Sequence, residues 1–103
     1  MSNLSTSSKA YKIFLEELLK HLANAQAIFA SDSEIDSEKI RIVGSAFHTI
    51  KGGAGFFGLS EVANLAGEIE GYFLKNNGDF SVEHAQRMIS DFQLLADKLP
   101  NHS

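Results

Sequence analysis

The chain is 103 residues long, 44% apolar and 21% charged, which suits a single compact domain with its own hydrophobic core. It has no cysteine, so disulfides, thiolate metal sites and cysteine nucleophiles are excluded, and a reducing compartment such as the cytoplasm is expected. No apolar run approaches the ~20 residues of a membrane span. The net charge is −4, and the sequence has no cluster of lysine or arginine of the kind that binds nucleic acid or an anionic membrane. A protein partner is therefore expected.

The first expected element is a long amphipathic helix over residues 9–30. Its apolar residues recur at steps of three and four from Tyr11 to Phe29, which is the spacing of one helix face. The Ser-rich residues 1–8 before it are expected to form a flexible lead, and residues 31–34 are expected to end the helix.

A second helix is expected to begin at Asp36, whose carboxylate can cap the amide groups of the first turn while Ile35 packs on Ile40. Its apolar positions continue in the same rhythm as far as Ala54. Gly58 then supplies the left-handed residue that commonly ends a helix.

Two further helices follow the same pattern. The third is opened by Ser60 and ended by the sequence Asn-Asn-Gly-Asp at residues 76–79. The fourth is capped by Ser81, places Val82 among its core-facing residues and is closed by Pro100.

Amphipathic helices joined by short polar loops predict an all-α fold, an antiparallel up-down four-helix bundle. The bundle is expected to span residues 9–100, with residues 101–103 as a short tail. Each helix has one clear apolar face, so a monomer is expected.

The stretch from His48 to Gly58 reads His-Thr-Ile-Lys-Gly-Gly-Ala-Gly-Phe-Phe-Gly, so glycines interrupt a helix whose apolar rhythm is otherwise intact. Each interior glycine costs an exposed helix about 0.8–1 kcal/mol relative to alanine. A partner surface that approaches closely beside His48 would account for this cost. For Gly53 and Gly55, a tight contact with another helix of the bundle is an equally good explanation.

A helical wheel places His48 on the side of the second helix that faces away from the core. The other residues on that side are Arg41, Gly44, Ser45, Lys51, Gly52 and Gly55. An exposed imidazole is in large part neutral at neutral pH and has a nucleophilic nitrogen, so His48 can accept a group. Lys51 lies one turn further along, where its ammonium can offset the charge of a phosphoryl group on His48. Gly52 leaves room for another protein's active site to close around the ring.

A nucleophilic histidine is commonly oriented by a carboxylate on its second ring nitrogen. Glu68 and Glu70 lie at opposite margins of the third helix's apolar face, so only one of them can face His48, and the spacing leaves the choice open. Phe56 projects toward the flank of its helix, where it can extend a docking patch beside His48 or be partly buried at the helix end. The other histidines lack the spacing of a metal site, and no metal site is expected.

The motif His-x-x-Lys-Gly begins at His48 and is followed by Gly58 at the matching distance. This pattern resembles the signature of histidine-containing phosphotransfer domains. Those domains are four-helix bundles that relay phosphoryl groups in two-component signalling. The longer string from His48 to Gly58 is most similar to the N-terminal phosphotransfer domain of chemotaxis histidine kinases. The resemblance implies that His48 is the phosphorylated residue, that Lys51 assists phosphotransfer and that Glu70 hydrogen-bonds the imidazole.

By the same resemblance, the partners are the catalytic domain of a histidine kinase and the receiver domain of a response regulator, with Mg²⁺ supplied by the partner and no cofactor bound by this chain. The residues expected to dock the partner are Arg41, Gly44, Ser45, Gly52, Gly55 and Phe56. One departure from the chemotaxis proteins is Gly67, where they commonly have a polar residue, often histidine. This departure removes one side chain from the hydrogen-bond network around the glutamate.

The chain is therefore expected to be a phosphocarrier in a phosphorelay and not itself a kinase. It has neither a glycine loop that would cradle phosphate nor the carboxylate and asparagine ligands that would hold Mg-ATP. The alternative is a non-catalytic adaptor, a bundle that binds a receiver domain without chemistry. A metal- or haem-binding bundle is disfavoured, because no expected helix has histidine or glutamate at the centre of its apolar face.

Overall fold

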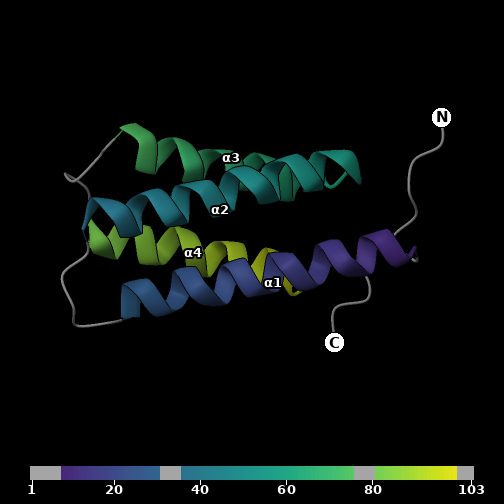
Figure 1. The fold of residues 1–103 in the computed structure, drawn as a ribbon, viewed down its shortest axis with the longest axis horizontal. Helices are drawn as coiled ribbons and strands as arrows, with labels where there is room; N and C mark the ends of the chain where they lie inside the picture. The colour runs from purple at the N-terminus through teal and green to yellow at the C-terminus, as the bar shows by residue number, and fades with distance from the viewer. Residues whose placement is uncertain (1–7, 31–35, 76–80, 100–103) are drawn as a thin grey trace.

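The computed structural model describes residues 8–30, 36–75 and 81–99. Within these residues the chain forms four α-helices, α1 (Lys9–Ala30), α2 (Ser37–Phe56), α3 (Ser60–Lys75) and α4 (Val82–Ala96). Successive helices run in opposite directions along the long axis of the molecule (Figure 1). The predicted antiparallel up-down four-helix bundle is confirmed.

The helices form a closed ring in which each one packs on two neighbours. α2 lies between α1 and α3, and α4 lies between α3 and α1. The closest packing is between α2 and α3, which also lie side by side in Figure 1. These two helices carry all three residues that the resemblance assigned to the reaction.

The core is built from one face of each helix, as the apolar spacing predicted. Its largest fully buried side chains include Phe47, Phe73 and Phe92. The ring of Phe47 meets that of Phe92 edge-on, with 5.1 Å between centroids. Phe73 stacks on Phe29 at 5.6 Å. Because the first pair joins α2 to α4 and the second joins α1 to α3, aromatic contacts connect both diagonals of the bundle.

Three of the helices, α1, α2 and α4, begin after a residue whose side chain satisfies an amide group of the first turn. The Asp36 carboxylate accepts a hydrogen bond from the Lys39 amide at 2.9 Å, and the Ser81 hydroxyl accepts one from the His84 amide at 3.1 Å, so both predicted caps are confirmed. Ser8, expected to belong to the flexible lead, instead accepts a hydrogen bond from the Tyr11 amide at 3.1 Å and starts α1.

A short turn joins α2 to α3. Gly58 has a φ of 73°, the left-handed value predicted for it. Its amide donates to the Gly55 carbonyl at 3.1 Å, and the Leu59 amide donates to the Ala54 carbonyl at 2.8 Å. These two bonds form a Schellman motif, which satisfies the last carbonyls of α2 and turns the chain back at once into α3.

The fourth helix differs from expectation at both ends. Val82 was expected to face the core but is 40% exposed, because it is the first helical residue and lies before the point where α4 packs on its neighbours. The helix ends at Ala96, a turn before Pro100. Pro100 lies outside the described residues, as do Ile35, residues 1–7, 76–79 and 101–103, so the expectations for them stay predictions.

Gly53→Ala is expected to destabilise the bundle, whereas Gly55→Ala is expected to stabilise it. A Cβ at position 53 would lie 2.6 Å from Cδ1 and Cε1 of Phe14, whose ring also packs against Phe57, so an overpacking cost of about 1–3 kcal/mol is expected. A Cβ at position 55 meets no heavy atom within 4 Å, so its higher helix propensity is expected to add up to about 1 kcal/mol. Urea unfolding followed by circular dichroism measures both changes, and a stabilised Gly53→Ala variant would contradict this assignment.

Candidate functional site

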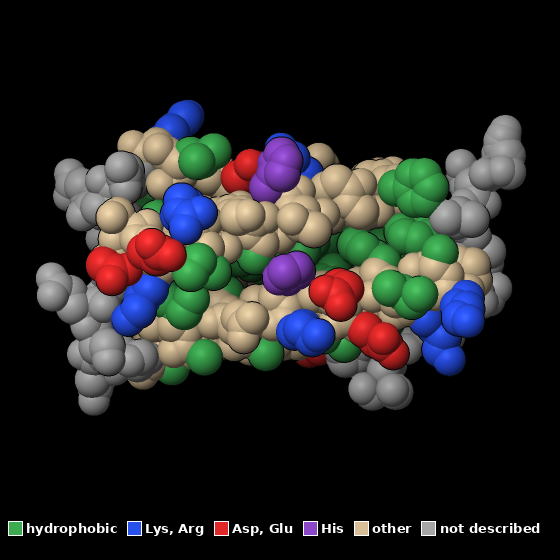
Figure 2. All heavy atoms as spheres, viewed as in Figure 1, with side chains coloured by type: hydrophobic (Ala, Val, Ile, Leu, Met, Phe, Trp, Pro, Cys, Tyr) green, Lys and Arg blue, Asp and Glu red, His purple; other side chains and the backbone are tan. Residues whose placement is uncertain are grey.

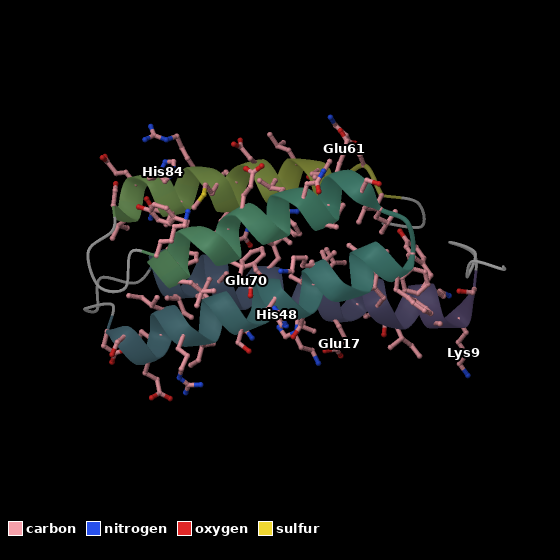
Figure 3. All side chains as sticks on the ribbon, turned by 90° about the horizontal axis from the view of Figure 1, so that it is seen from above. Lys9, Glu17, His48, Glu61, Glu70 and His84 are labelled. Atoms are coloured by element: carbon pink, nitrogen blue, oxygen red, sulfur yellow. The ribbon has the colours of Figure 1, made fainter. Side chains whose placement is uncertain are left out.

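His48 lies near the middle of α2 on the side facing away from the core. Its side chain is 67% exposed, which confirms the orientation that the helical wheel predicted. Figure 3 shows His48 on α2 next to Glu70 on α3, far from the labelled residues at the ends of the helices. The imidazole is thus accessible from solvent while it is held from one side by the neighbouring helix.

Glu70 is the residue that holds the imidazole. Its Oε2 atom lies 2.8 Å from Nδ1 of His48, and its side chain is only 13% exposed. An ionised carboxylate can only accept hydrogen bonds, so Nδ1 carries the proton and donates it. In the neutral ring, Nε2 is then the unprotonated nitrogen, with its lone pair available for reaction. The choice left open between two glutamates is decided by position, because Glu68 is exposed and makes no such contact.

Lys51 pairs with the second oxygen of the same carboxylate. Its Nζ atom lies 2.8 Å from Oε1 of Glu70. Spacing along α2 had suggested that Lys51 serves a group on His48, and it gave no sign of an ion pair with α3. Glu70 therefore bridges an imidazole and an ammonium, one on each carboxylate oxygen.

The charges around Glu70 favour its ionised form. The hydrogen bond from the Lys51 ammonium lowers the pKa of the Glu70 carboxyl below its ordinary value of 4.5, and the hydrogen bond from His48 acts in the same direction. Partial burial opposes both effects by raising the pKa, but it does not outweigh them. The carboxylate is charged at neutral pH and able to accept a hydrogen bond from the Nδ1–H group of His48.

The turn at Gly58 brings these residues to the same height in the bundle. His48 lies ten residues before Gly58 and Glu70 lies twelve residues after it. At a rise of about 1.5 Å per residue, the two positions differ by only about 3 Å along antiparallel helices. A longer loop would leave this register undetermined.

A groove of about 610 Å³ opens beside His48 between α2 and α3. Its lining residues are Ser37, Glu38, Ile40, Arg41, Gly44, Ser45, His48, Glu70, Phe73 and Leu74. Three of the predicted docking residues therefore line one groove together with the histidine. The sequence gave no indication of the apolar side chains that contribute to it, Ile40 and Phe73 from the core and Leu74, which is 69% exposed.

The docking residues at this end of α2 differ in exposure. Arg41 and Ser45 are exposed, and Arg41 forms an ion pair with Glu38 at 3.3 Å. Gly44 was expected on the surface but is buried, because α3 approaches α2 so closely that a Cβ there would lie 3.9 Å from Cβ of Phe73. A Cβ at that distance would make an ordinary van der Waals contact, so the packing of α3 on α2 does not by itself require a glycine here.

On the other side of His48, α2 presents an open surface. Gly52 and Gly55 are exposed, and a Cβ at either position meets no heavy atom within 4 Å. Phe56 is 65% exposed and touches the bundle through an edge-on contact with Phe57, at 5.4 Å between centroids. The partial burial considered for Phe56 is therefore small, and most of its ring faces solvent.

Within residues 8–30, 36–75 and 81–99, no group of three or more histidine, aspartate or glutamate side chains is arranged to hold a metal ion. None of the helices in those ranges combines the length and apolarity that a bilayer crossing needs. On the face shown in Figure 2, positive and negative side chains are interspersed rather than gathered into a cationic patch.

The fold and the site together define an all-α bundle protein that presents an exposed histidine, oriented by a carboxylate, to its surroundings. A family model described as the Hpt domain matches residues 9–101. The chain belongs to the Hpt domain family, which has a phosphotransfer role in phosphorelay signalling. No curated protein and no solved structure matches the chain.

Glu70→Gln is expected to lower the free energy of unfolding at neutral pH by about 1 kcal/mol, because an amide cannot form the ion pair with Lys51. The pKa of Glu70 is lower in the folded than in the unfolded chain, so the carboxylate contributes its full stabilisation above its ordinary pKa of 4.5 and loses it as the pH falls through the folded value. The difference in the free energy of unfolding between wild type and Glu70→Gln should therefore become smaller as the pH is lowered. Urea unfolding over a pH series from about 7 to about 3 measures it.

Glu68→Gln is the matched control, since it removes the same charge from an exposed position of the same helix. Any effect of net charge alone appears in both variants. If the two variants lose the same stability and show the same pH dependence, Glu70 does not have the bridging role described above.

Proposed function

We propose that His48 is the phosphoacceptor of a phosphocarrier, taking a phosphoryl group from a kinase domain or a receiver aspartate and passing it to the aspartate of a response regulator. The observation that carries this proposal is an exposed imidazole whose Nδ1 is held by a carboxylate at 2.8 Å, so that Nε2 is the nucleophilic nitrogen. Membership in the Hpt family supports the same role.

In the proposed step, the Nε2 lone pair of His48 forms a bond to phosphorus while the bond from phosphorus to the donor oxygen breaks, and the electrons of that bond leave with the oxygen. The donor is ATP held by the kinase or the acyl phosphate of a receiver. The ring gains positive charge, which the Glu70 carboxylate stabilises through the Nδ1 proton. In the return step the N–P bond breaks, its electrons stay on Nε2, and an aspartate oxygen of the receiver takes the phosphoryl group.

The chain itself supplies the nucleophile and two charges, and the partner supplies the remainder of the catalytic apparatus. Each oxygen of Glu70 already has a partner, His48 on one and Lys51 on the other. We assign the Mg²⁺ that phosphoryl transfer uses to the partner's active site, along with ATP binding. The ammonium of Lys51 pairs with Oε1 of Glu70, the carboxylate that holds the His48 ring. From this side of the site it can offset the charge of a phosphoryl group on His48.

The partner's approach follows from the surfaces on either side of His48. A receiver aspartate must come within bonding distance of phosphorus, so the receiver necessarily covers the ring and its surroundings. The groove lined by Arg41, Gly44 and Ser45 is continuous with His48 and offers an apolar floor for a receiver helix. The bare stretch at Gly52 and Gly55, with Phe56 beyond it, leaves room for the receiver's active-site loops. The finer assignments to a chemotaxis system, to the cytoplasm and to a monomer stay predictions.

His48→Gln is expected to abolish phosphorylation, because glutamine keeps a polar side chain but has no nucleophilic nitrogen. The wild-type chain is incubated with radiolabelled phosphorylated receiver domains and histidine kinases from the same genome. It should acquire a phosphate that is labile in acid and stable in alkali, as a phosphohistidine is. The measurement is the label retained on the chain after gel electrophoresis.

Binding of the same receivers, measured by isothermal titration calorimetry, separates this proposal from the adaptor alternative. If wild type and His48→Gln both bind a receiver and neither is labelled by any donor, the chain is an adaptor. Equal labelling of the two chains would place the phosphate on another residue.

Gly52→Leu is expected to slow transfer from a protein donor by about tenfold or more, because a side chain there stands beside the imidazole in the path of the docking partner. Loading of His48 by phosphoramidate, a small phosphoryl donor, should be much less affected. The ratio of the two rates is the measurement. Equal slowing with both donors would show that the substitution disturbs His48 itself.

A further inference from the structure

Gly67 lies on α3 one turn before Glu70, and the aliphatic part of the Lys51 side chain passes over it. A Cβ built at position 67 would lie 3.2 Å from Cδ of Lys51, which is closer than an ordinary van der Waals contact. Beyond this crossing, the Lys51 ammonium reaches Oε1 of Glu70 at 2.8 Å. The lysine therefore occupies the space that a side chain at position 67 would need.

We propose that Gly67 is a positioning residue: its missing side chain lets Lys51 lie flat across α3, and this holds the ammonium on the carboxylate that orients His48. Gly67 touches neither His48 nor the reacting atoms and acts only through Lys51. The proposal rests on the phosphotransfer role given to His48 above and identifies a residue that tunes it.

The position of Lys51 supports this role for the glycine. A surface lysine normally extends into solvent, and its exposed ion pairs contribute little because two long side chains must be ordered to make them. Lys51 is only 43% exposed, and its stem lies against a helix that fixes its direction toward Glu70. Because the aliphatic part of Lys51 already rests against α3, fewer side-chain conformers are lost when the ion pair with Glu70 forms.

Glycine inside a helix weakens it relative to alanine, so its presence in α3 calls for a reason. Gly71 lies one turn further along the same helix, and a Cβ there would meet no heavy atom within 4 Å. At Gly67 the corresponding space is filled by Lys51. The two glycines of α3 therefore allow a matched comparison. A side chain at Gly67 would displace Lys51, whereas a side chain at Gly71 would displace nothing.

The first test measures the pKa of the Glu70 carboxyl group by carbon-detected NMR in four chains: wild type, Gly67→Leu, Lys51→Met and the double variant. Displacing the ammonium removes the main cause of the low pKa, so Gly67→Leu and Lys51→Met should each raise the pKa toward the ordinary value of 4.5. In the double variant, Gly67→Leu should add nothing to the effect of Lys51→Met, because the lysine through which it acts is absent.

Two further variants control for helix stability and for gross disturbance of the fold. Gly71→Leu adds the same side chain to the same helix and should leave the pKa of Glu70 unchanged. Gly67→Ala introduces only a Cβ, 3.2 Å from Cδ of Lys51. It should therefore raise the pKa of Glu70 as well, but by less than Gly67→Leu does. A Gly67→Leu effect that persists in the Lys51→Met background would mean that leucine acts on Glu70 directly, and the proposal would then be wrong. An unchanged pKa in Gly67→Leu would overturn it as well.

The second test measures transfer from a phosphorylated receiver domain to the same chains. Lys51→Met and Gly67→Leu should slow transfer to a similar extent, by about tenfold, and the double variant should be no slower than Lys51→Met alone. The two experiments fail separately. If the pKa responses appear but His48 takes no phosphoryl group in the wild type, the positioning role of Gly67 stands and the proposed function is rejected.

Discussion

The short Schellman turn at Gly58 fixes the register between α2 and α3, and the site depends on that register. A left-handed residue with a φ of 73° and two backbone hydrogen bonds turn the chain back without an intervening loop. Residues at similar distances on either side of the turn must then meet, as His48 and Glu70 do. The close approach of Gly44 to Phe73 extends the same register to the far end of the pair and keeps the two helices in contact over most of their length. The imidazole and its carboxylate are therefore placed by backbone geometry rather than by flexible loops.

Within this frame, a single carboxylate organises the charges. One oxygen of Glu70 accepts a hydrogen bond from Nδ1–H of His48, and the other oxygen pairs with the Lys51 ammonium. The first contact selects the tautomer that leaves Nε2 unprotonated, and the second lowers the pKa of the carboxyl further and holds its other oxygen in place. In the proposed transfer, a phosphoryl group that bonds to Nε2 would make the ring more positive and would itself bring negative charge. The carboxylate, hydrogen-bonded to Nδ1, would stabilise the first of these charges, and the ammonium one turn along α2 is the cation that would offset the second.

The parts of this arrangement that lie within one helix were predictable from the sequence. Asp36 and Ser81 as caps, Gly58 as the turn and the outward direction of His48 all follow from local spacing, and each is found as expected. The parts that depend on two helices were not predictable in the same way. A wheel drawn for α3 places Glu68 and Glu70 at two margins of one face, but it cannot say which margin α2 covers. For the same reason the ion pair of Lys51, the burial of Gly44 and the crossing over Gly67 were missed. The contact of Glu70 with His48 was implied by the family resemblance, and counting residues outward from Gly58 is a second signal that brings the two positions together.

The glycines of α2 show how much of the helix's unfavourable composition is explained without a partner. Four of them lie inside the helix, and at about 0.8–1 kcal/mol each they cost it roughly 3–4 kcal/mol relative to alanine. Gly53 leaves room for the ring of Phe14, so the packing of the bundle accounts for this glycine, whereas a Cβ at Gly44 would make only an ordinary contact with Phe73. Gly52 and Gly55 face open space beside His48 and relieve no internal contact. Gly52 and Gly55 together carry about half of the total cost, roughly 2 kcal/mol, and this is the part that a docking partner beside His48 would explain.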